Sequence, residues 1–231
     1  MIELKDVEFG WSGNSTVLAI PTLQIGAGEL VFLKGPSGSG KSTLLGLISG
    51  VLDARSGSVA VKGVDLSQRS RAARDRFRAD HIGYIFQMFN LLPYLSVLDN
   101  VLLPARFSSQ RAQRASKATG KIEAEAHRLL SALGLEAALH TGRASVQLSQ
   151  GQQQRVAAAR ALFGQPELLI ADEPTSSLDA DARERFLDLV IGECKKAGTT
   201  LLFVSHDTSL ARLFDRSIAL TDINKASQVA A

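Results

Sequence analysis

The amino-acid sequence predicts an α/β fold built on a mostly parallel sheet. Four short apolar runs are each followed by a helical pattern, and they lie at 29–35, 81–87, 167–173 and 199–207. Apolar strands that alternate with helices are typical of a parallel sheet whose two faces are both covered. A glycine-rich turn between the first strand and its helix is a second, independent sign of this fold class.

The elements follow one another in a regular order. The first run leads into a helix at 41–50, and the second precedes a long helical stretch. The third leads into a helix at 180–198 and the fourth into a helix at 208–215, after which a last strand is predicted at 216–222.

Two regions depart from this alternation. Residues 1–34 and 57–64 have the pattern of alternating strands with glycine-rich turns, which predicts a small antiparallel sheet. Residues 88–160 contain no convincing strand and have helical patterns, which predicts a separate helical region.

Within the helical region, a polar and basic link at 108–121 joins the predicted helices 96–107 and 121–134. A run of this kind predicts a solvated helix or loop, and contact with a membrane surface is the alternative.

The composition is that of an ordinary globular protein. The chain has 231 residues, is 45% hydrophobic and 21% charged, and carries a formal net charge of +3, which does not argue for nucleic acid binding. Its single cysteine, Cys194, excludes an internal disulfide framework and suits a reducing compartment. Because no apolar run approaches the roughly 18 residues that span a bilayer, and the N-terminus lacks a signal layout, we expect a chain that is neither secreted nor membrane-spanning.

The turn after the first strand has the spacing of a phosphate-binding loop. Four residues separate Gly35 from Gly40, Lys41 and Ser42, between an apolar strand and a helix, which is the context that this pattern requires. Glycines let successive backbone N–H groups face inward, and the helix N-terminus adds its positive dipole end. We expect Lys41 to reach the β- and γ-phosphates and the Ser42 hydroxyl to bind Mg²⁺; the alternative is a plain glycine-rich turn. The predicted contacts with the nucleotide are Gly35, Pro36, Ser37, Gly38, Ser39, Gly40, Lys41, Ser42 and Thr43.

Polar residues also end three later strands. Asp172 and Glu173 close one apolar run, His206 closes another, and Gln87 ends a third. Ligands of doubly wound sheets bind at the carboxyl ends of the strands. We therefore expect Asp172 to help hold Mg²⁺, and Glu173 to orient or deprotonate the attacking water. His206 would bond to the γ-phosphate or to the water, and the Gln87 amide oxygen would complete the Mg²⁺ shell. The alternatives are a helix-capping acidic pair and a solvated loop histidine.

Taken together, these motifs resemble those of ABC-transporter ATP-binding subunits. They occur in the order of that family: "GPSGSGKST" (Walker A), Gln87 (Q-loop), "LSQGQ" at 148–152 (signature), "LLIADE" at 168–173 (Walker B and glutamate), "SSLD" at 176–179 (D-loop) and His206 (H-loop). The resemblance implies hydrolysis of ATP with Mg²⁺. Its catalytic residues would be Lys41, Glu173 and His206, and its metal ligands Ser42, Gln87 and Asp172.

The resemblance also implies one P-loop NTPase domain over 1–231. Residues 1–87 and 161–224 would form a RecA-like core with an antiparallel β-subdomain, 88–160 an inserted helical subdomain, and 225–231 a tail. Trp11 falls where the family places an aromatic residue that stacks on adenine. Phe9 is the alternative for that role, and core packing is the alternative function for either ring.

The helix that begins near Ser149 has an unusual first turn, Gln-Gly-Gln-Gln-Gln. The resemblance implies that Ser149, Gly151 and Gln152 contact ATP held by a second copy. The free N–H groups and dipole of this helix would then point at that phosphate instead of serving the helix itself. Such contacts predict a two-fold homodimer around two ATP molecules, with Asp179 crossing the interface.

Two positions depart from the family pattern. Gln150 replaces the usual glycine of the signature, and Ser177 replaces the usual alanine of the D-loop. A first-turn residue has negative φ and keeps its backbone N–H, so we expect Gln150 to be tolerated with its side chain away from the γ-phosphate.

The resemblance implies a separate membrane permease as partner. That partner would place the chain in the cytoplasm, peripheral on the inner face of the cell membrane. The segment after Gln87 is apolar, and we expect Phe89, Leu91, Leu92 and Tyr94 to line a groove for a cytoplasmic helix of the permease. Plain helix packing is the alternative.

The subfamily signs are weaker. "LLPYLSVLDNV", "ADEPT" and the short tail resemble the lipoprotein-release and macrolide-export group, which includes related cell-division ATPases, whereas "FNLLP" also resembles ATPases of amino-acid importers. Outside transport, a DNA-repair ATPase would insert long coiled coils, and a translation-associated protein would carry two cassettes. A non-hydrolysing scaffold is disfavoured by Glu173 and His206. We therefore expect no nucleic acid partner, while the cargo does not follow from these motifs.

Overall fold

The computed structural model describes residues 1–11, 15–135, 144–176 and 178–226. Its main sheet has five parallel strands in the order β6-β7-β8-β3-β9, as the alternation of apolar runs and helices predicts. The strands are β6 (Ile82–Ile85), β7 (Leu168–Asp172), β8 (Thr200–Val204), β3 (Leu30–Lys34) and β9 (Arg216–Ala219).

The two faces of the main sheet are buried in different hydrophobic clusters. In β3, Phe32 packs against Phe203 and Phe214 on one face. Val31 and Leu33 join the other cluster, which contains the apolar residues of α1 (Lys41–Ile48). Because successive strand residues point to opposite faces, a strand buried on both sides is apolar throughout, which is why the sequence shows continuous runs here.

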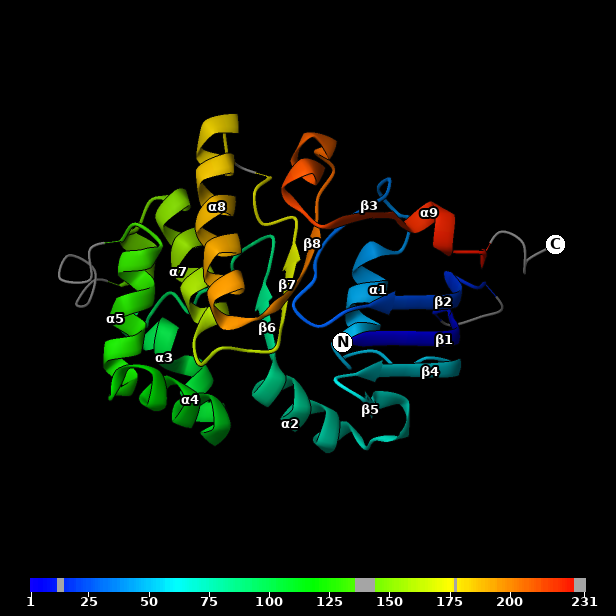
Figure 1. Cartoon of the computed structure of the whole chain (residues 1–231), viewed down its shortest axis with the longest axis horizontal. Helices are drawn as coiled ribbons and strands as arrows, with labels where there is room; N and C mark the ends of the chain where they lie inside the picture. Colours follow the sequence, from blue (N-terminus) through cyan, green and yellow to red (C-terminus); the bar gives the residue numbers. More distant parts are fainter. Residues whose placement is uncertain (12–14, 136–143, 177, 227–231) are drawn as a thin grey trace.

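A second sheet is antiparallel and has four strands in the order β2-β1-β4-β5. The strands are β1 (Ile2–Phe9), β2 (Leu18–Ile25), β4 (Ser56–Val61) and β5 (Val64–Asp65). It lies beside α1, on the opposite side of the main sheet from α5 and α7 (Figure 1). The predicted small antiparallel sheet is confirmed, although it takes only the first 25 residues of the segment 1–34, since β3 belongs to the main sheet.

Helices gather on the other side of the main sheet (Figure 1). They are α3 (Val97–Phe107), α4 (Ser109–Thr119), α5 (Ile122–Ala132) and α7 (Gln150–Leu162), with α8 (Ala180–Ala197) packed next to α7 and α2 (Arg71–His81) below. Several begin at a serine whose hydroxyl accepts the N–H of the third helical residue, as Ser70, Ser96 and Ser108 do. Such caps satisfy N–H groups that the helix itself leaves unpaired.

Several element boundaries differ from the predicted ones. β6 ends at Ile85, so Gln87 lies in the turn beyond it. The predicted helix at 208–215 is a 3₁₀ helix over Thr208–Leu213, and the predicted strand at 216–222 ends at Ala219, where α9 (Leu220–Ile223) begins. α7 continues through the predicted boundary between 160 and 161. Helix α2 has no counterpart among the predicted elements, because its sequence is mostly polar and charged and buries only one large apolar side chain, Phe77.

The prediction of a solvated link at 108–121 is wrong for one face of α4. Arg111 is only 3% exposed and Ala115 is fully buried. The Arg111 guanidinium donates to backbone carbonyl oxygens, so a residue type that usually marks a solvated surface here ties the helix to its neighbours.

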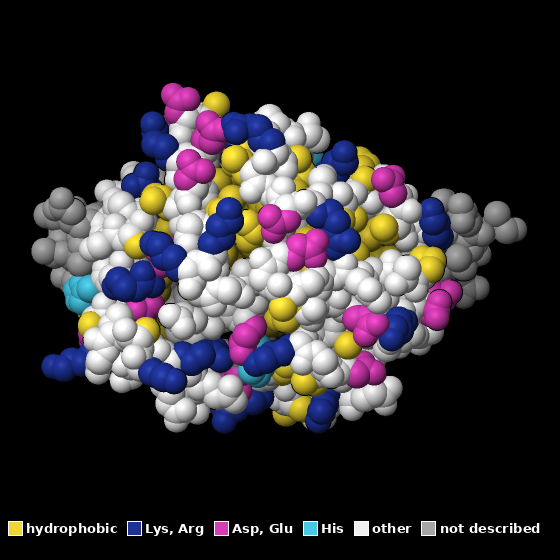
Figure 2. All heavy atoms as spheres, in the orientation of Figure 1, with side chains coloured by type: hydrophobic (Ala, Val, Ile, Leu, Met, Phe, Trp, Pro, Cys, Tyr) yellow, Lys and Arg dark blue, Asp and Glu magenta, His cyan; other side chains and the backbone are white. Residues whose placement is uncertain are grey.

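Three further observations bear on the environment of the chain. Among the described residues, no helix is both long enough and apolar enough to cross a membrane. On the face drawn in Figure 2, basic and acidic side chains are interspersed.

Cys194 is buried in α8, where burial raises the pKa of its thiol to about 12. A thiol with so high a pKa behaves as a small apolar residue of the core.

Candidate nucleotide-binding site

The turn between β3 and α1 is held open by glycine. Gly40 has a φ of 98° and a ψ of 13°, a left-handed conformation that residues with a Cβ disfavour. A Cβ at that position would also lie 2.8 Å from Leu18 Cδ2. Glycine therefore allows α1 to begin directly at Lys41, and the first N–H groups of the helix have no partner within the helix.

Lys41 is buried against this turn. Its Nζ donates to the carbonyl oxygens of Gly35 at 2.8 Å and Pro36 at 3.0 Å, and it lies 3.8 Å from Glu173 Oε1. Nearby, Ser39 Oγ is buried and has no hydrogen-bond partner among the described residues. A buried ammonium, unpaired helical N–H groups and a free hydroxyl at one turn fit a phosphate group.

Asp172 and Ser42 bring two oxygen donors together. Ser42 Oγ donates to Asp172 Oδ2 at 3.4 Å, from the start of α1 to the end of β7. Burial raises the pKa of Asp172, and the charge of Glu173 raises it further. Oxygen donors of this kind are the ligands that Mg²⁺ prefers, and a nearby cation would favour the ionised carboxylate. The pair therefore fits a magnesium ion.

Glu173 and His206 meet at the ends of adjacent strands. β7 and β8 are paired in parallel, with Asp172 opposite Val204, so the residues that follow each strand lie side by side. His206 Nε2 lies 2.5 Å from Glu173 Oε1. Glu173 has a φ of 47°, and its N–H donates to Val204 O at 3.0 Å. Left-handed backbone at a residue with a side chain is strained and tends to occur at functional sites.

Lys41, Ser42, Glu173 and His206 line a cavity of about 550 Å³, whereas Asp172 and Ser39 do not line it. Trp11 lines it and is 56% exposed, whereas Phe9 is 6% exposed. The two rings meet edge to face, with their centroids 5.1 Å apart. The exposed ring is therefore Trp11, and Phe9 supports it from the core. Of the residues predicted from the sequence, the cavity brings together Trp11, Ser37, Gly38, Gly40, Lys41, Ser42, Thr43, Gln87, Glu173 and His206. Gly35 and Pro36 line an adjoining hollow of about 330 Å³, which His206 shares.

The signature residues lie apart from this cavity. Within the part of the chain that the structure describes, Ser149, Gly151 and Gln152 do not line it. Ser149 and Gln150 are exposed, and a Cβ added to Gly151 would meet no described atom within 4 Å. The start of α7 thus presents an open backbone, while Ser177 of the neighbouring motif lies outside the described residues.

Side chains of this first turn hydrogen-bond within their own helix, with Ser149 as its N-cap. Ser149 Oγ accepts from Gln152 N at 3.3 Å, and Gln152 Oε1 accepts from Ser149 N at 3.1 Å, which is a complete capping box. Gln153 Nε2 donates to Leu148 O at 3.0 Å, and buried Gln154 Nε2 donates to Pro174 O at 2.8 Å. The Gln-rich turn therefore stabilises its own helix and joins it to the loop after Glu173.

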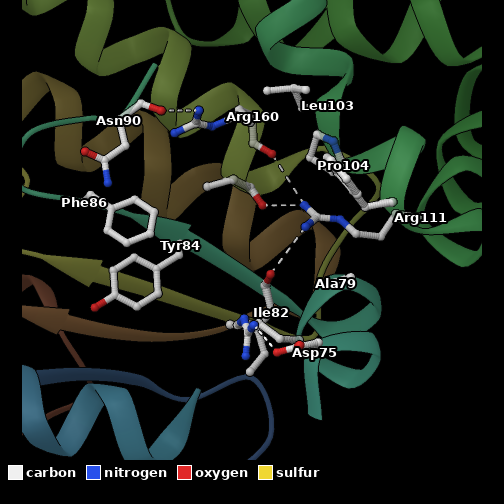
Figure 3. A pocket seen from close by; sticks show the side chains of 13 residues that line it. Asp75, Ala79, Ile82, Tyr84, Phe86, Asn90, Leu103, Pro104, Arg111 and Arg160 are labelled. Carbon is white, nitrogen blue, oxygen red and sulfur yellow. Dashed lines mark hydrogen bonds and ion pairs between the residues drawn. The ribbon is translucent and has the colours of Figure 1, made fainter. Parts of the chain in front are cut away.

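A second hollow, of about 390 Å³, lies between α2, β6, α3 and α7 (Figure 3). Tyr84 and Phe86 stack on one another along it at 4.2 Å, and exposed Phe107 closes it at the end of α3. We call this hollow the α2–α3 groove; it is lined by Asp75, Arg78, Ala79, Ile82, Tyr84, Phe86, Asn90, Leu103, Pro104, Phe107, Arg111, Arg160 and Ala161.

The residues predicted to contact a permease lie outside the α2–α3 groove, and their contact with a permease stays a prediction. Phe89 is buried in the core, Tyr94 is 76% exposed, and neither lines the α2–α3 groove, nor do Leu91 and Leu92. The groove comes instead from α2 and from the far end of α3, which are distant in the sequence and carry no motif. An arginine inside the otherwise apolar run VAAARAL is a signal for Arg160, whereas Arg111 lies in a polar and basic stretch that gives no such signal.

The chain is similar to proteins of known family. A family model described as ABC transporter matches residues 18–176. The lipoprotein-releasing system ATP-binding protein LolD of Anaeromyxobacter dehalogenans is 46% identical over 201 residues, which cover 87% of this chain and 80% of LolD. The macrolide export ATP-binding/permease protein MacB of Rhodopirellula baltica is 40% identical over 218 residues, which cover 94% of this chain and 31% of that longer protein.

Among solved structures, the ATP-binding cassette MJ0796, in a dimeric post-hydrolysis state bound to ADP and Pi, superimposes with a TM-score of 0.80. It is 34% identical, and the match covers 95% of this chain and 94% of that chain. Its match extends over the main sheet, the antiparallel sheet and the helical region described above.

Proposed function

This chain belongs to the ABC transporter family, and from that premise we propose that it hydrolyses ATP in the cavity beside Lys41 to drive a membrane permease. The observation that supports this most directly is the placement of Glu173, whose Oε1 lies 2.5 Å from His206 Nε2 and 3.8 Å from Lys41 Nζ. A carboxylate fixed between an imidazole and a phosphate-binding lysine is suited to activate a water next to a γ-phosphate.

In this proposal Glu173 is the base. Its carboxylate accepts a proton from the water as the water oxygen bonds to the γ-phosphorus, and the bond from that phosphorus to the bridging oxygen breaks to give ADP and phosphate. Lys41 leaves its contacts with Gly35 and Pro36 to pair with the phosphates. His206 orients the carboxylate, and Trp11 stacks on the adenine at the open side of the cavity.

Mg²⁺ is the proposed cofactor. Ser42, Asp172 and Gln87 would hold it, and Ser42 and Asp172 already face one another. When bound, it supplies positive charge that neutralises the phosphate oxygens. Gln87 lines the same cavity, so its amide oxygen is available to the proposed metal without movement of the turn that carries it.

The working form in this proposal is a homodimer around two ATP molecules. The exposed start of α7, with open backbone at Gly151, supports contact with a phosphate held by a second copy. Such an interface is self-complementary under a two-fold axis. The dimeric cassette to which this chain is similar supports the same arrangement. Asp179 caps α8 next to this interface in the proposed dimer.

The proposed partner is an integral membrane permease, with the α2–α3 groove as its contact surface. The groove is mainly apolar, and exposed Phe86 and Phe107 line it, which suits the apolar face of a short cytoplasmic helix. We propose a permease of the lipoprotein-release or macrolide-export kind, supported by the similarity to LolD and MacB. The chain would then work in the cytoplasm, on the inner face of the cell membrane, without a nucleic acid partner.

Measuring phosphate release tests the proposed function. The wild-type chain should hydrolyse ATP in the presence of Mg²⁺, and Lys41→Ala should lose nucleotide binding or turnover. Lys5→Ala is a matched control, because Lys5 is an exposed lysine of β1 that pairs with Glu3. Normal turnover of Lys41→Ala would contradict the assignment of this cavity.

A further inference from the structure

The loop that follows Gln87 has a strained backbone. Phe89 and Asn90 have φ values of 58° and 49°, in the left-handed region that residues with side chains disfavour. Two short-range bonds tighten the loop, from Phe89 N to Phe86 O at 3.0 Å and from Asn90 N to Met88 O at 2.6 Å. Because this backbone conformation is disfavoured, contacts from outside the loop are needed to hold it.

Arg160 makes contacts that hold it. Its Nη2 donates to Phe89 O at 2.6 Å and its Nη1 to Asn90 O at 2.7 Å, and Figure 3 shows the guanidinium reaching the Asn90 carbonyl. Both terminal nitrogens of the planar guanidinium are used, in a fixed fork that a single ammonium nitrogen does not provide. The two residues with disfavoured φ are therefore the same two whose carbonyls are bound.

Arg160 belongs to the helix that starts at Ser149. Arg160 lies eleven positions after Ser149, which corresponds to about 16 Å along the axis of α7. The C-terminal end of α7, where Arg160 lies, is also anchored by Arg111. The Arg111 guanidinium donates to Phe163 O at 2.7 Å and to Ala161 O at 2.6 Å. A Cβ added to Gly83 of β6 would lie 2.2 Å from Ala161 O, so α7 and β6 are in close contact there.

We propose that Arg160 is a positioning residue for Gln87: it ties the loop after Gln87 to the signature helix α7, so that the magnesium-binding amide and Ser149 move as one unit. This inference rests on the proposed role of Gln87 as a metal ligand. Arg160 and Asn90 also line the α2–α3 groove.

The test compares Arg160→Ala with Arg155→Ala. Arg155 lies on the same helix and donates to Gly134 O at 3.3 Å, away from the loop. Two properties are measured on the full chain: hydrogen exchange of the Phe89 and Asn90 amides, and the Mg²⁺ concentration that gives half-maximal ATP hydrolysis. Arg160→Ala should speed the exchange of both amides about tenfold or more and raise the half-saturating Mg²⁺ about fivefold, while Arg155→Ala changes neither.

A double-mutant cycle with Gln87→Ala separates positioning from a general loss of structure. If Arg160 acts through Gln87, adding Arg160→Ala to Gln87→Ala changes the Mg²⁺ requirement no further. Additive effects would overturn the proposal, as would unchanged exchange in Arg160→Ala. If Arg160→Ala does not fold, Arg160→Gln replaces it in both measurements. Lack of ATPase activity in the wild-type chain would refute the proposed function, and the exchange comparison would still decide whether Arg160 holds the loop.

Discussion

His206 Nε2 lies 2.5 Å from Glu173 Oε1, and this contact joins the ends of two parallel strands. The register of β7 and β8 places both residues just beyond the sheet. The left-handed φ of Glu173 turns the chain there. Asp172 and Glu173 are neighbours in sequence, yet Asp172 contacts Ser42 while Glu173 contacts His206 and Lys41. In the proposed mechanism, Asp172 therefore serves the metal and Glu173 the attacking water.

Replacing Glu173 with glutamine should abolish turnover without abolishing ATP binding. Glutamine keeps the shape of the side chain but cannot accept the proton, so turnover should fall by about 10²-fold or more. ATP should then accumulate in the closed state, and the variant should elute as an ATP-dependent dimer in size-exclusion chromatography. Glu123→Gln, at an exposed glutamate of α5, is the control and should behave as wild type. Wild-type turnover of Glu173→Gln would remove Glu173 as the base.

His206→Ala should also slow hydrolysis, because the Glu173 carboxylate loses the group that orients it. We expect turnover to fall by about 10²-fold and the affinity for ATP to stay within about twofold, since the phosphate contacts of Lys41 remain. His127→Ala, on α5, provides a histidine control outside the cavity. If the affinity falls while turnover per bound ATP is unchanged, His206 is a binding residue only.

The strand ends of the site were predictable because they follow local rules. Asp172, Glu173 and His206 stand at or just beyond the ends of apolar runs, and parallel strands bring their carboxyl ends to one edge. That places Asp172, Glu173 and His206 together without knowledge of the packing. Gln87 was predicted with them, although β6 stops at Ile85 and Gln87 belongs to the turn.

Other features depend on contacts between distant segments, which periodicity does not encode. The α2–α3 groove needs the packing of α2 against β6 and α3, and α2 shows little apolar periodicity. The contacts of Arg111 and Arg160 with backbone carbonyls need α7 in place. The cap at Ser149 is different, since Ser149 followed three residues later by Gln152 is a recognisable local pattern.

Trp11 should report nucleotide binding directly, because it is the single tryptophan of the chain. Its exposed ring lines the cavity, so ATP should change its fluorescence. Trp11→Ala should weaken ATP binding about tenfold, equivalent to about 1.4 kcal/mol, and Trp11→Phe should keep most of the affinity. Phe9→Leu should lower thermal stability more than affinity, as Phe9 is buried. A larger loss of affinity from Phe9→Leu than from Trp11→Ala would reverse these roles.

Gln150→Gly should leave hydrolysis within about twofold of wild type. Gln150 is the first residue of α7, and its exposed side chain lies outside the capping box formed by Ser149 and Gln152. Glycine early in a helix costs up to about 1 kcal/mol, so the melting temperature should fall slightly. Steady-state ATPase assays and thermal unfolding measure the two effects. A large increase in ATPase activity would show that Gln150 restrains the site.

Asp172→Asn should make the chain more stable while removing its activity. Burial raises the pKa of Asp172, and Glu173 raises it further, so the folded chain holds this proton more tightly than the unfolded chain does. As the pH rises through the window above about 4, the ordinary value for aspartate, this carboxylate lowers the free energy of unfolding. Asparagine lacks that charge. Without nucleotide or Mg²⁺, the variant should therefore unfold at a higher temperature than wild type at pH 7, and the difference should shrink as the pH falls toward 4.

Adding Mg²⁺ and ATP should stabilise the wild type more than the Asp172→Asn variant, because the ionised carboxylate then has a cation to bind. A variant that is less stable at pH 7 in the absence of ligand would contradict the buried, charged state of Asp172.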